Sequence, residues 1–244
     1  MRIEIWSDVV CPWCFVGKRR LERALESFEH ADQVEVVWRS FQLDPSAPPH
    51  GHGAERQLTT PVLARKYGRP EDEMRDMQQQ LVDLAAEEGL AFRLFETVHT
   101  STLDAHRLLH LALDQGGLDL QGRLKEALLS AYFEDAADIG DHQVLRREAL
   151  ALDLDPERLE EVLAGEEYAD AVAADIDAAQ GLGVSGVPFF VVDRRYAVSG
   201  AQPTEVFSRL LDRAWSEAHP PVQLVGGAVG GAAGDACGID GSAC

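Results

Sequence analysis

The chain has 244 residues, of which 45% are hydrophobic and 26% charged, a composition typical of one large globular domain or of one domain with an insertion. Its 22 basic and 42 acidic residues give a net charge of −20, which argues against nucleic acids and anionic membranes as partners. No apolar run approaches the roughly 20 residues of a membrane span. The N-terminus lacks the apolar region of a secretory signal, so we expect a cytoplasmic protein.

The N-terminal part of the chain predicts a βαβ unit. Residues 2–7 alternate like a strand, and apolar side chains from Phe15 to Phe28 recur at helical spacing. Residues 34–41 are rich in β-branched and aromatic side chains and are the second predicted strand, parallel to the first in the usual right-handed arrangement. The proline- and glycine-rich stretch 45–54 marks a change of domain.

The next segment, from about residue 56 to residue 181, predicts helices almost throughout. Its glycines, prolines and aspartates divide it into five to seven helices. Ser101 to Asp104 resembles a capping box, with aspartate in place of the usual glutamate or glutamine, and predicts the start of one helix. We therefore expect a compact helical domain here.

The pattern then returns to strands. Residues 189–192 predict a buried strand directly after a proline, residues 195–199 its hairpin partner, and the apolar stripe from Val206 to Trp215 a last helix. The expected fold class is therefore α/β with an inserted all-helical domain.

These patterns give the domain organisation. The α/β domain is expected in two parts, residues 1–53 and 182–217, around the helical domain at 54–181. Residues 218–244 are rich in glycine and alanine and cannot form a core, so we expect a flexible tail.

A pair of cysteines, Cys11 and Cys14, stands between the first predicted strand and the first predicted helix. Cys-x-x-Cys pairs hold half a zinc site, ligate iron–sulfur clusters or form redox dithiols. Helix positions i and i+3 lie about 5–6 Å apart, which suits a disulfide, and Pro12 fits a first helical turn. The context favours a redox dithiol, and a zinc-held or redox-sensing interaction module is the alternative outside catalysis.

The two cysteines have different predicted roles. Cys11 lies at the helix N-terminus, whose free N–H groups and partial positive charge favour a thiolate, so we expect it to be exposed and nucleophilic, with a lowered pKa. Cys14, one turn inward, is expected to resolve the mixed disulfide. His106 and His110 have the spacing of a metal pair but lack the glutamate of a metalloprotease motif, and we expect no metal.

Three stretches resemble a known family. They are Ser7 to Cys14 (Ser-Asp-Val-Val-Cys-Pro-Trp-Cys), Ser40 to Pro45 (Ser-Phe-Gln-Leu-Asp-Pro) and Asp104 to Arg107 (Asp-Ala-His-Arg). With the Val-Pro before a strand and the inserted helices, they make residues 1–217 similar to the DsbA family of the thioredoxin superfamily. Within it they resemble the cytoplasmic FrnE-like branch, which is grouped with 2-hydroxychromene-2-carboxylate isomerases and kappa-class glutathione transferases. The resemblance implies a thioredoxin fold with a helical insertion and a protein disulfide oxidoreductase or isomerase acting by dithiol–disulfide exchange.

The resemblance also implies site residues and partners. Val187–Pro188 would be a cis peptide beside the dithiol, where Pro188 shapes a site for a substrate strand and Val187 offers backbone groups. The isomerase and transferase relatives usually carry serine at the position of Cys11, so the intact pair favours disulfide chemistry. Glutathione-dependent isomerisation or transfer on the same scaffold is the alternative. The implied partners are thiols and disulfides of proteins or small molecules, with glutathione a candidate, no further cofactor, and a monomeric or homodimeric protein.

Four other side chains are candidate site residues, and three of them have two interpretations each. Asp8 either tunes the thiols or caps the helix. Pro12 and Trp13 separate the cysteines without the histidine of strongly oxidising relatives, so Pro12 is a candidate for tuning the pair, and Trp13 either offers apolar surface to substrate or packs against the insertion. His106 either lines the cleft between domains and contacts substrate, or is a packing histidine.

A second cysteine pair, Cys237 and Cys244, ends the tail. Cys237 lies 19 positions after Ala218, and a flexible chain of that length spans about 24 Å, which is enough to reach Cys11. We hypothesise that the tail pair forms a disulfide that exchanges with Cys11, as an electron relay or a regulatory cap. The alternative is a chain end with two spare thiols.

Overall fold

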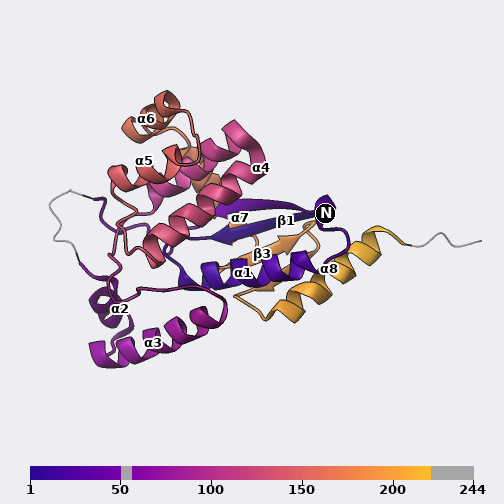
Figure 1. The fold of residues 1–244 in the computed structure, drawn as a ribbon, viewed down its shortest axis with the longest axis horizontal. Coiled ribbons are helices and arrows are strands. Elements are labelled where there is room, and N and C mark those ends of the chain that lie inside the picture. The colour runs from indigo at the N-terminus through magenta and orange to yellow at the C-terminus, as the bar shows by residue number, and fades with distance from the viewer. Residues whose placement is uncertain (51–56, 221–244) are drawn as a thin grey trace, which may run out of the picture.

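The computed structural model of the protein describes residues 1–50 and 57–220, and its centre is a four-stranded sheet (Figure 1). The strands are β1 (Arg2–Ser7), β2 (Glu35–Ser40), β3 (Phe189–Val192) and β4 (Tyr196–Ser199). Their order is β2-β1-β3-β4, with β1 parallel to β2 and β3 antiparallel to both of its neighbours. The four predicted strands and the α/β class are confirmed. Within the described residues no helix is both long and apolar enough to cross a bilayer.

The two faces of the sheet are covered by different helices, because side chains along a strand alternate between faces. Ile3 and Ile5 point to the face that α1 (Pro12–Glu26) and α8 (Thr204–Ala218) cover, and they form a core there with Leu21, Phe190, Phe207 and Leu211. Trp6 points to the other face, where it packs near Ala179 of α7 (Ala169–Gly181).

The helices between β2 and β3 make the second half of the molecule. They are α2 (Thr59–Tyr67), α3 (Glu71–Glu87), α4 (Leu103–Phe133), α5 (His142–Leu150), α6 (Pro156–Ala164) and α7. In Figure 1, α2 and α3 lie together at one end of the sheet, whereas α5 and α6 lie on the far side of α4. The largest apolar cluster of the described residues runs through α3, α4, α5 and α6 and includes Phe15 of α1, so the inserted helices and the sheet domain share a core.

The predicted capping box at the start of α4 is wrong. Thr102 is the N-cap residue, and its side chain makes no capping hydrogen bond. Asp104 instead accepts hydrogen bonds from Arg107 (2.7 Å) and pairs with His142 Nε2 (2.7 Å), so its carboxylate joins α4 to α5. The predicted break at Gly116 and Gly117 lies inside α4, where Gly117 has φ +66° and two helical segments meet.

Side chains from the insertion cover the open edge of the sheet. Strand β2 is an edge strand, and its Trp38 donates its backbone N–H to Gln121 Oε1 and accepts from Gln121 Nε2, both at 3.0 Å. Two residues further along β2, the Ser40 N–H donates to Asp175 Oδ2 at 2.9 Å. Gln121 on α4 and Asp175 on α7 thus take the place of a fifth strand, which fixes α4 against the end of the sheet that carries the cysteines.

Candidate active site

The cysteine pair lies where the first strand turns into the first helix. Strand β1 ends at Ser7, and α1 begins at Pro12 with Cys11 as its N-cap. The Cys11 N–H donates to the Asp8 carbonyl at 3.3 Å, and the Cys14 N–H donates to the Cys11 carbonyl at 3.0 Å. Both cysteines are free thiols in this structure. The predicted placement of the motif, with Pro12 in the first turn, is confirmed.

Cys11 and Cys14 differ in their access to a cavity. Cys11 lines a large cavity, and Cys14 is not among the residues that line it. Cys11 is nevertheless only 4% exposed and Cys14 only 1%, so the prediction of an exposed Cys11 is wrong. The Val187 carbonyl lies against its sulfur, and α2 and α3 line the cavity that Cys11 also lines, so the cavity is the approach to Cys11.

The loop before β3 faces Cys11. The Val187–Pro188 peptide bond is cis, and the Cys11 Sγ–H donates to the Val187 carbonyl at 3.4 Å. Helix α1 approaches this loop closely because Gly17 has no side chain: a β-carbon there would lie 3.1 Å from Pro188 Cγ and 3.2 Å from Phe190 Cζ. The structure therefore brings Val187 and Pro188 to the cysteine pair.

The two thiols ionise as a pair, which loses a first proton more readily than a second. Burial opposes ionisation of Cys14, but the neighbouring Cys11 thiol, the positive charge of Lys125 and the Asp8 N–H lower its pKa overall. The hydrogen bond to Cys14 and burial raise the pKa of Cys11 well above its ordinary value. Such values belong to the pair as a whole, in which one thiolate is favoured and a second is opposed.

The two thiols, and not Cys11 alone, determine the charge that the site carries. The helix N-terminus was expected to lower the pKa of Cys11, and that stays a prediction, because the shifted pKa values belong to the two coupled thiols together. Cys14 lies one turn deeper, where the charge of Lys125 favours a thiolate, and the Cys11 Sγ–H donates to the Val187 carbonyl.

Lys125 is the site residue that sequence reasoning missed. It comes from α4, is completely buried, and burial is the main cause that lowers its pKa to about 8. A signal was present in the sequence: Gln121, Leu124, Lys125 and Leu128 follow the i, i+3, i+4, i+7 spacing of one helix face. Two polar residues within an apolar stripe indicate side chains with buried partners.

Asp8 and His106 form a buried pair behind the cysteines. Asp8 Oδ1 lies 3.2 Å from His106 Nε2, and Asp8 Oδ2 accepts from the Leu43 N–H at 2.8 Å. The Asp8 side chain therefore does not cap α1, and its charge contributes to the raised pKa of Cys11. His106 is completely buried and does not line the cavity, so the predicted contact with substrate is not what its position supports. Burial lowers the pKa of His106, which favours a neutral ring that donates to Asp8.

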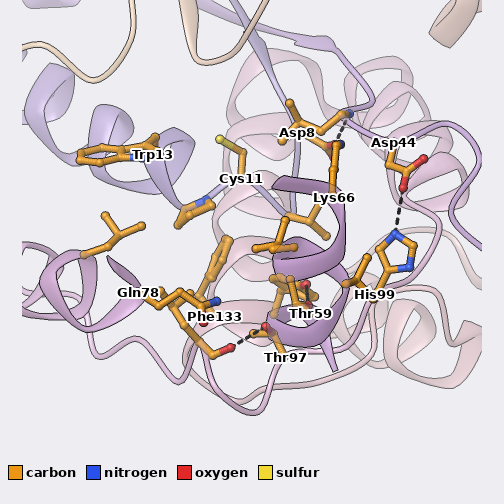
Figure 2. A pocket seen from close by; sticks show the side chains of 18 of the residues that line it. Asp8, Cys11, Trp13, Asp44, Thr59, Lys66, Gln78, Thr97, His99 and Phe133 are labelled. Carbon is orange, nitrogen blue, oxygen red and sulfur yellow. Dashed lines mark hydrogen bonds and ion pairs between the residues drawn. The ribbon is translucent and has the colours of Figure 1, made fainter. Parts of the chain in front are cut away.

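The cavity has a volume of about 620 Å³ and lies between the start of α1 and the helices α2 and α3 (Figure 2). Its wall is mostly apolar, with Met74, Leu81, Leu84, Leu94 and Phe133 among the lining side chains. Figure 2 shows Cys11 and Trp13 on one side of the pocket and Gln78, Thr97 and Phe133 across from them. Trp13 is 42% exposed and lines the cavity, as expected of apolar surface beside Cys11.

Two further sequence predictions concern the second cysteine pair and metal binding. Cys237 and Cys244 lie outside the described residues. Within residues 1–50 and 57–220, no three cysteine, histidine, aspartate or glutamate side chains gather in a way that would hold a metal ion.

Comparison with known proteins gives the relationships of the chain. The sequence model of a family described as the DSBA-like thioredoxin domain matches residues 2–212. A solved structure described as a probable DsbA oxidoreductase from Streptomyces coelicolor is 44% identical in sequence, with a TM-score of 0.82. That alignment covers 99% of this chain and 97% of the other.

Two more distant structures share the fold. A 2-hydroxychromene-2-carboxylate isomerase is 12% identical, with a TM-score of 0.66 over 91% of this chain and 100% of its own. The cytosolic disulfide reductase DsbM from Pseudomonas aeruginosa, solved with GSH, is 19% identical, with a TM-score of 0.56 over 88% of this chain and 99% of its own. The thioredoxin fold with an inserted helical domain, which the sequence predicted, is confirmed.

Proposed function

The chain belongs to the family of DSBA-like thioredoxin domains, and from this premise we propose that it is a thiol–disulfide oxidoreductase in which Cys11 and Cys14 form the redox couple. The observation that carries the proposal is that only one of the two sulfurs can be reached from the cavity. Cys11 is the sulfur that lines the cavity, while Cys14 lies behind it among the groups that stabilise a thiolate.

The first step forms a mixed disulfide. A proton passes from Cys11 to Cys14, with which it shares a hydrogen bond, and Cys11 becomes the thiolate. The Cys11 sulfur attacks one sulfur of a substrate disulfide, so that a bond between Cys11 and the substrate forms, the substrate disulfide breaks, and one substrate thiolate leaves. The Val187 carbonyl, free of the Cys11 proton, is then available to a backbone N–H of the substrate.

The second step releases the substrate. Cys14 gives its proton to the substrate thiolate that left first and attacks the Cys11 sulfur, which forms the Cys11–Cys14 disulfide and expels the second substrate thiolate. The substrate has gained two electrons and the enzyme has lost two, and the reverse sequence oxidises a substrate dithiol. We propose that the partners are thiols and disulfides of proteins or small molecules in the cytoplasm.

The cavity supports a second candidate function for the protein. Its volume and apolar wall are typical of sites for small ligands, and Lys66 and Gln78 add polar groups to it. A glutathione-dependent isomerase or transferase on this scaffold would use such a cavity for its substrate. That reaction needs one sulfur near the substrate and not two, so it would survive the loss of Cys14.

Single-cysteine variants distinguish the two candidates. We expect Cys14→Ser to accumulate a mixed disulfide at Cys11 when it is given oxidised glutathione or insulin, because the attack that releases the adduct is lost, and insulin reduction to fall to background. Cys11→Ser should form no adduct at position 14, which the cavity does not reach. Mass spectrometry of the intact protein detects the adduct.

The tail cysteines need a control, because a sulfur from Cys237 or Cys244 could also release the adduct. The same variants are therefore made with Cys237→Ser and Cys244→Ser. Full insulin reduction by Cys14→Ser in that background would contradict the proposal, and glutathione-dependent isomerisation that persists in it would favour the second candidate.

A further inference from the structure

Gln78 is a buried polar residue on the apolar face of α3. It lies between Met74 and Leu81 at the i, i+4, i+7 spacing of one helix face, where apolar side chains are expected. It is 7% exposed, and it lines the same cavity as Cys11. A buried amide without hydrogen-bond partners destabilises a protein, so the partners of its oxygen and of its nitrogen both need an explanation.

The oxygen of the Gln78 amide has a partner, whereas the nitrogen has none. Thr60 on α2 donates its hydroxyl proton to Gln78 Oε1 at 2.8 Å, which orients the amide. The two N–H donors of Nε2 make no hydrogen bond within the described part of the chain, and this atom is not sealed inside the protein. Figure 2 shows Gln78 across the cavity from Cys11 and Trp13. The two donors are therefore available to a ligand in the cavity.

The other polar side chains of the cavity wall are paired, exposed or turned elsewhere. The paired ones are Asp8, Asp44, Thr59, Thr97, His99, Thr102 and Tyr132. Lys66, Tyr67 and Gln80 are exposed to solvent. The Thr100 hydroxyl has no partner, but it lies against Gly140 and is sealed there. Among the described residues, Gln78 is thus the buried wall residue that offers free donors to the cavity.

The rest of the wall is apolar and adaptable. Two of the three methionines of the chain, Met74 and Met77, are among its residues, and methionine packs against ligands of many shapes. The cavity volume of about 620 Å³ is typical of sites for small ligands. Because Cys11 is buried, this approach favours an arm that enters the cavity over a disulfide held on the surface of a folded protein.

We propose that the substrate is a small-molecule disulfide with one arm in the cavity, where its sulfur meets Cys11 and its carbonyl oxygen accepts a hydrogen bond from Gln78 Nε2. The apolar body of that arm contacts Met74 and Met77. Gln78 is then a specificity-determining residue, and its free donors are explained by the bound substrate. The inference rests on the proposed function, because it assumes that Cys11 exchanges with disulfides.

The exchange itself follows the steps proposed above. A bond forms between Cys11 Sγ and the sulfur of the bound arm as the substrate disulfide breaks, and the other arm leaves as a thiolate that takes the proton of Cys14. Closure of the Cys11–Cys14 disulfide then releases the bound arm as the second thiolate. The two electrons pass from the cysteine pair to the substrate, and Gln78 only binds.

Matched disulfides test the chemistry of the arm. The reduced full-length protein is given dialkyl disulfides and bis(carbamoylalkyl) disulfides of equal and increasing arm length, and peptide mass spectrometry follows the oxidation of Cys11. Each rate is divided by the rate of the same probe with free cysteine. At one arm length we expect the carbamoyl probe to react about tenfold faster than the alkyl probe, because its carbonyl oxygen then reaches Gln78.

Two substitutions of Gln78 remove its donors in different ways. Gln78→Glu keeps an acceptor for Thr60, whereas Gln78→Met keeps neither donor nor acceptor. Both variants should lose the tenfold preference and keep the rate with the dialkyl probe, which a folding defect would lower. The matched control is Gln79→Met, at the next position of α3, which is exposed, does not line the cavity and should keep the preference.

An NMR measurement on the unaltered protein does not depend on how the variants fold. The side-chain amide signals of Gln78 should shift when the alkanamide of the favoured arm length is added, and not with the alkylamine of equal length. Unmoved signals, equal rates of the two probe classes at every arm length, or a preference that survives both Gln78 variants would overturn the inference. A cysteine pair that exchanges with no disulfide, oxidised glutathione included, would instead overturn the proposed function.

Discussion

Cys11 and Cys14 have different surroundings, although only two residues separate them. Cys11 lines the cavity and has the Val187 carbonyl at 3.4 Å as an acceptor. Cys14 does not line it, and the Asp8 N–H and the charge of Lys125 favour its thiolate. The sulfur that can meet a substrate therefore differs from the sulfur that lies behind it, and the pair as a whole favours one thiolate and opposes a second.

His106 makes the stability of the fold depend on pH. Its pKa in the folded protein lies below the ordinary 6.5, chiefly because the ring is buried. The unfolded chain therefore takes up a proton first as the pH falls. Stability is constant above about pH 6.5 and is lost below it, down to the folded pKa, by at most about 1.4 kcal/mol per pH unit for this one group.

His106→Gln is expected to reduce that dependence. The glutamine amide can still donate to Asp8 but does not titrate, so the variant should lose about 1 kcal/mol less than the unaltered protein between about pH 7 and pH 5. Urea unfolding at the two pH values measures the difference, and His219→Gln, at an exposed position, is the control. An equal loss in His106→Gln and the unaltered protein would show that His106 does not contribute.

At the scale of elements, α4 connects the insertion to the redox couple. It supplies His106 to Asp8, Gln121 to the backbone of β2, and Lys125 to the cysteines. Lys125 follows Gln121 by one helical turn, so the two hydrogen bonds that hold Gln121 on Trp38 also fix where the Lys125 ammonium lies. The insertion is thus part of the site and not only a cover over it.

Replacing Gln121 tests how much this edge contact contributes. Gln121→Leu has a similar volume but leaves the Trp38 N–H and carbonyl buried without partners, at about 1–3 kcal/mol each. We expect the free energy of unfolding in urea to fall by about 2–4 kcal/mol. Gln79→Leu, which removes an exposed contact with Asp83, should change it by less than about 0.5 kcal/mol. Equal effects of the two substitutions would contradict the assignment.

The sequence allowed the elements to be predicted better than the site. Strands such as 2–7 and 189–192 follow from alternation over a few neighbouring residues, and the Cys-x-x-Cys pair follows from the strand and helix beside it. The groups that set the pKa values come from far along the chain, as Lys125 does for Cys14. Local patterns give the face on which a residue lies but not what that face meets, and this is why Cys11 was expected to be exposed.

At the scale of the whole molecule, the cavity lies where the two halves meet. The sheet domain supplies Cys11 and Trp13, and α2 and α3 of the insertion supply the apolar wall. The net charge of −20 opposes the approach of acidic partners, so it favours substrates that are neutral or basic around the disulfide. Tyr67 and Met77, 61% and 48% exposed, also line this cavity, and they extend its apolar surface toward solvent.

The most direct test of this account is a redox titration of the full-length chain. The protein is equilibrated with glutathione buffers of known ratio, its free thiols are alkylated, and peptide mass spectrometry assigns each cysteine. The account predicts one two-electron transition that links Cys11 to Cys14, and a disulfide of Cys237 or Cys244 with Cys11 would support the tail relay. Cysteines 11 and 14 that remain alkylated at every ratio, or that pair only with glutathione, would contradict it.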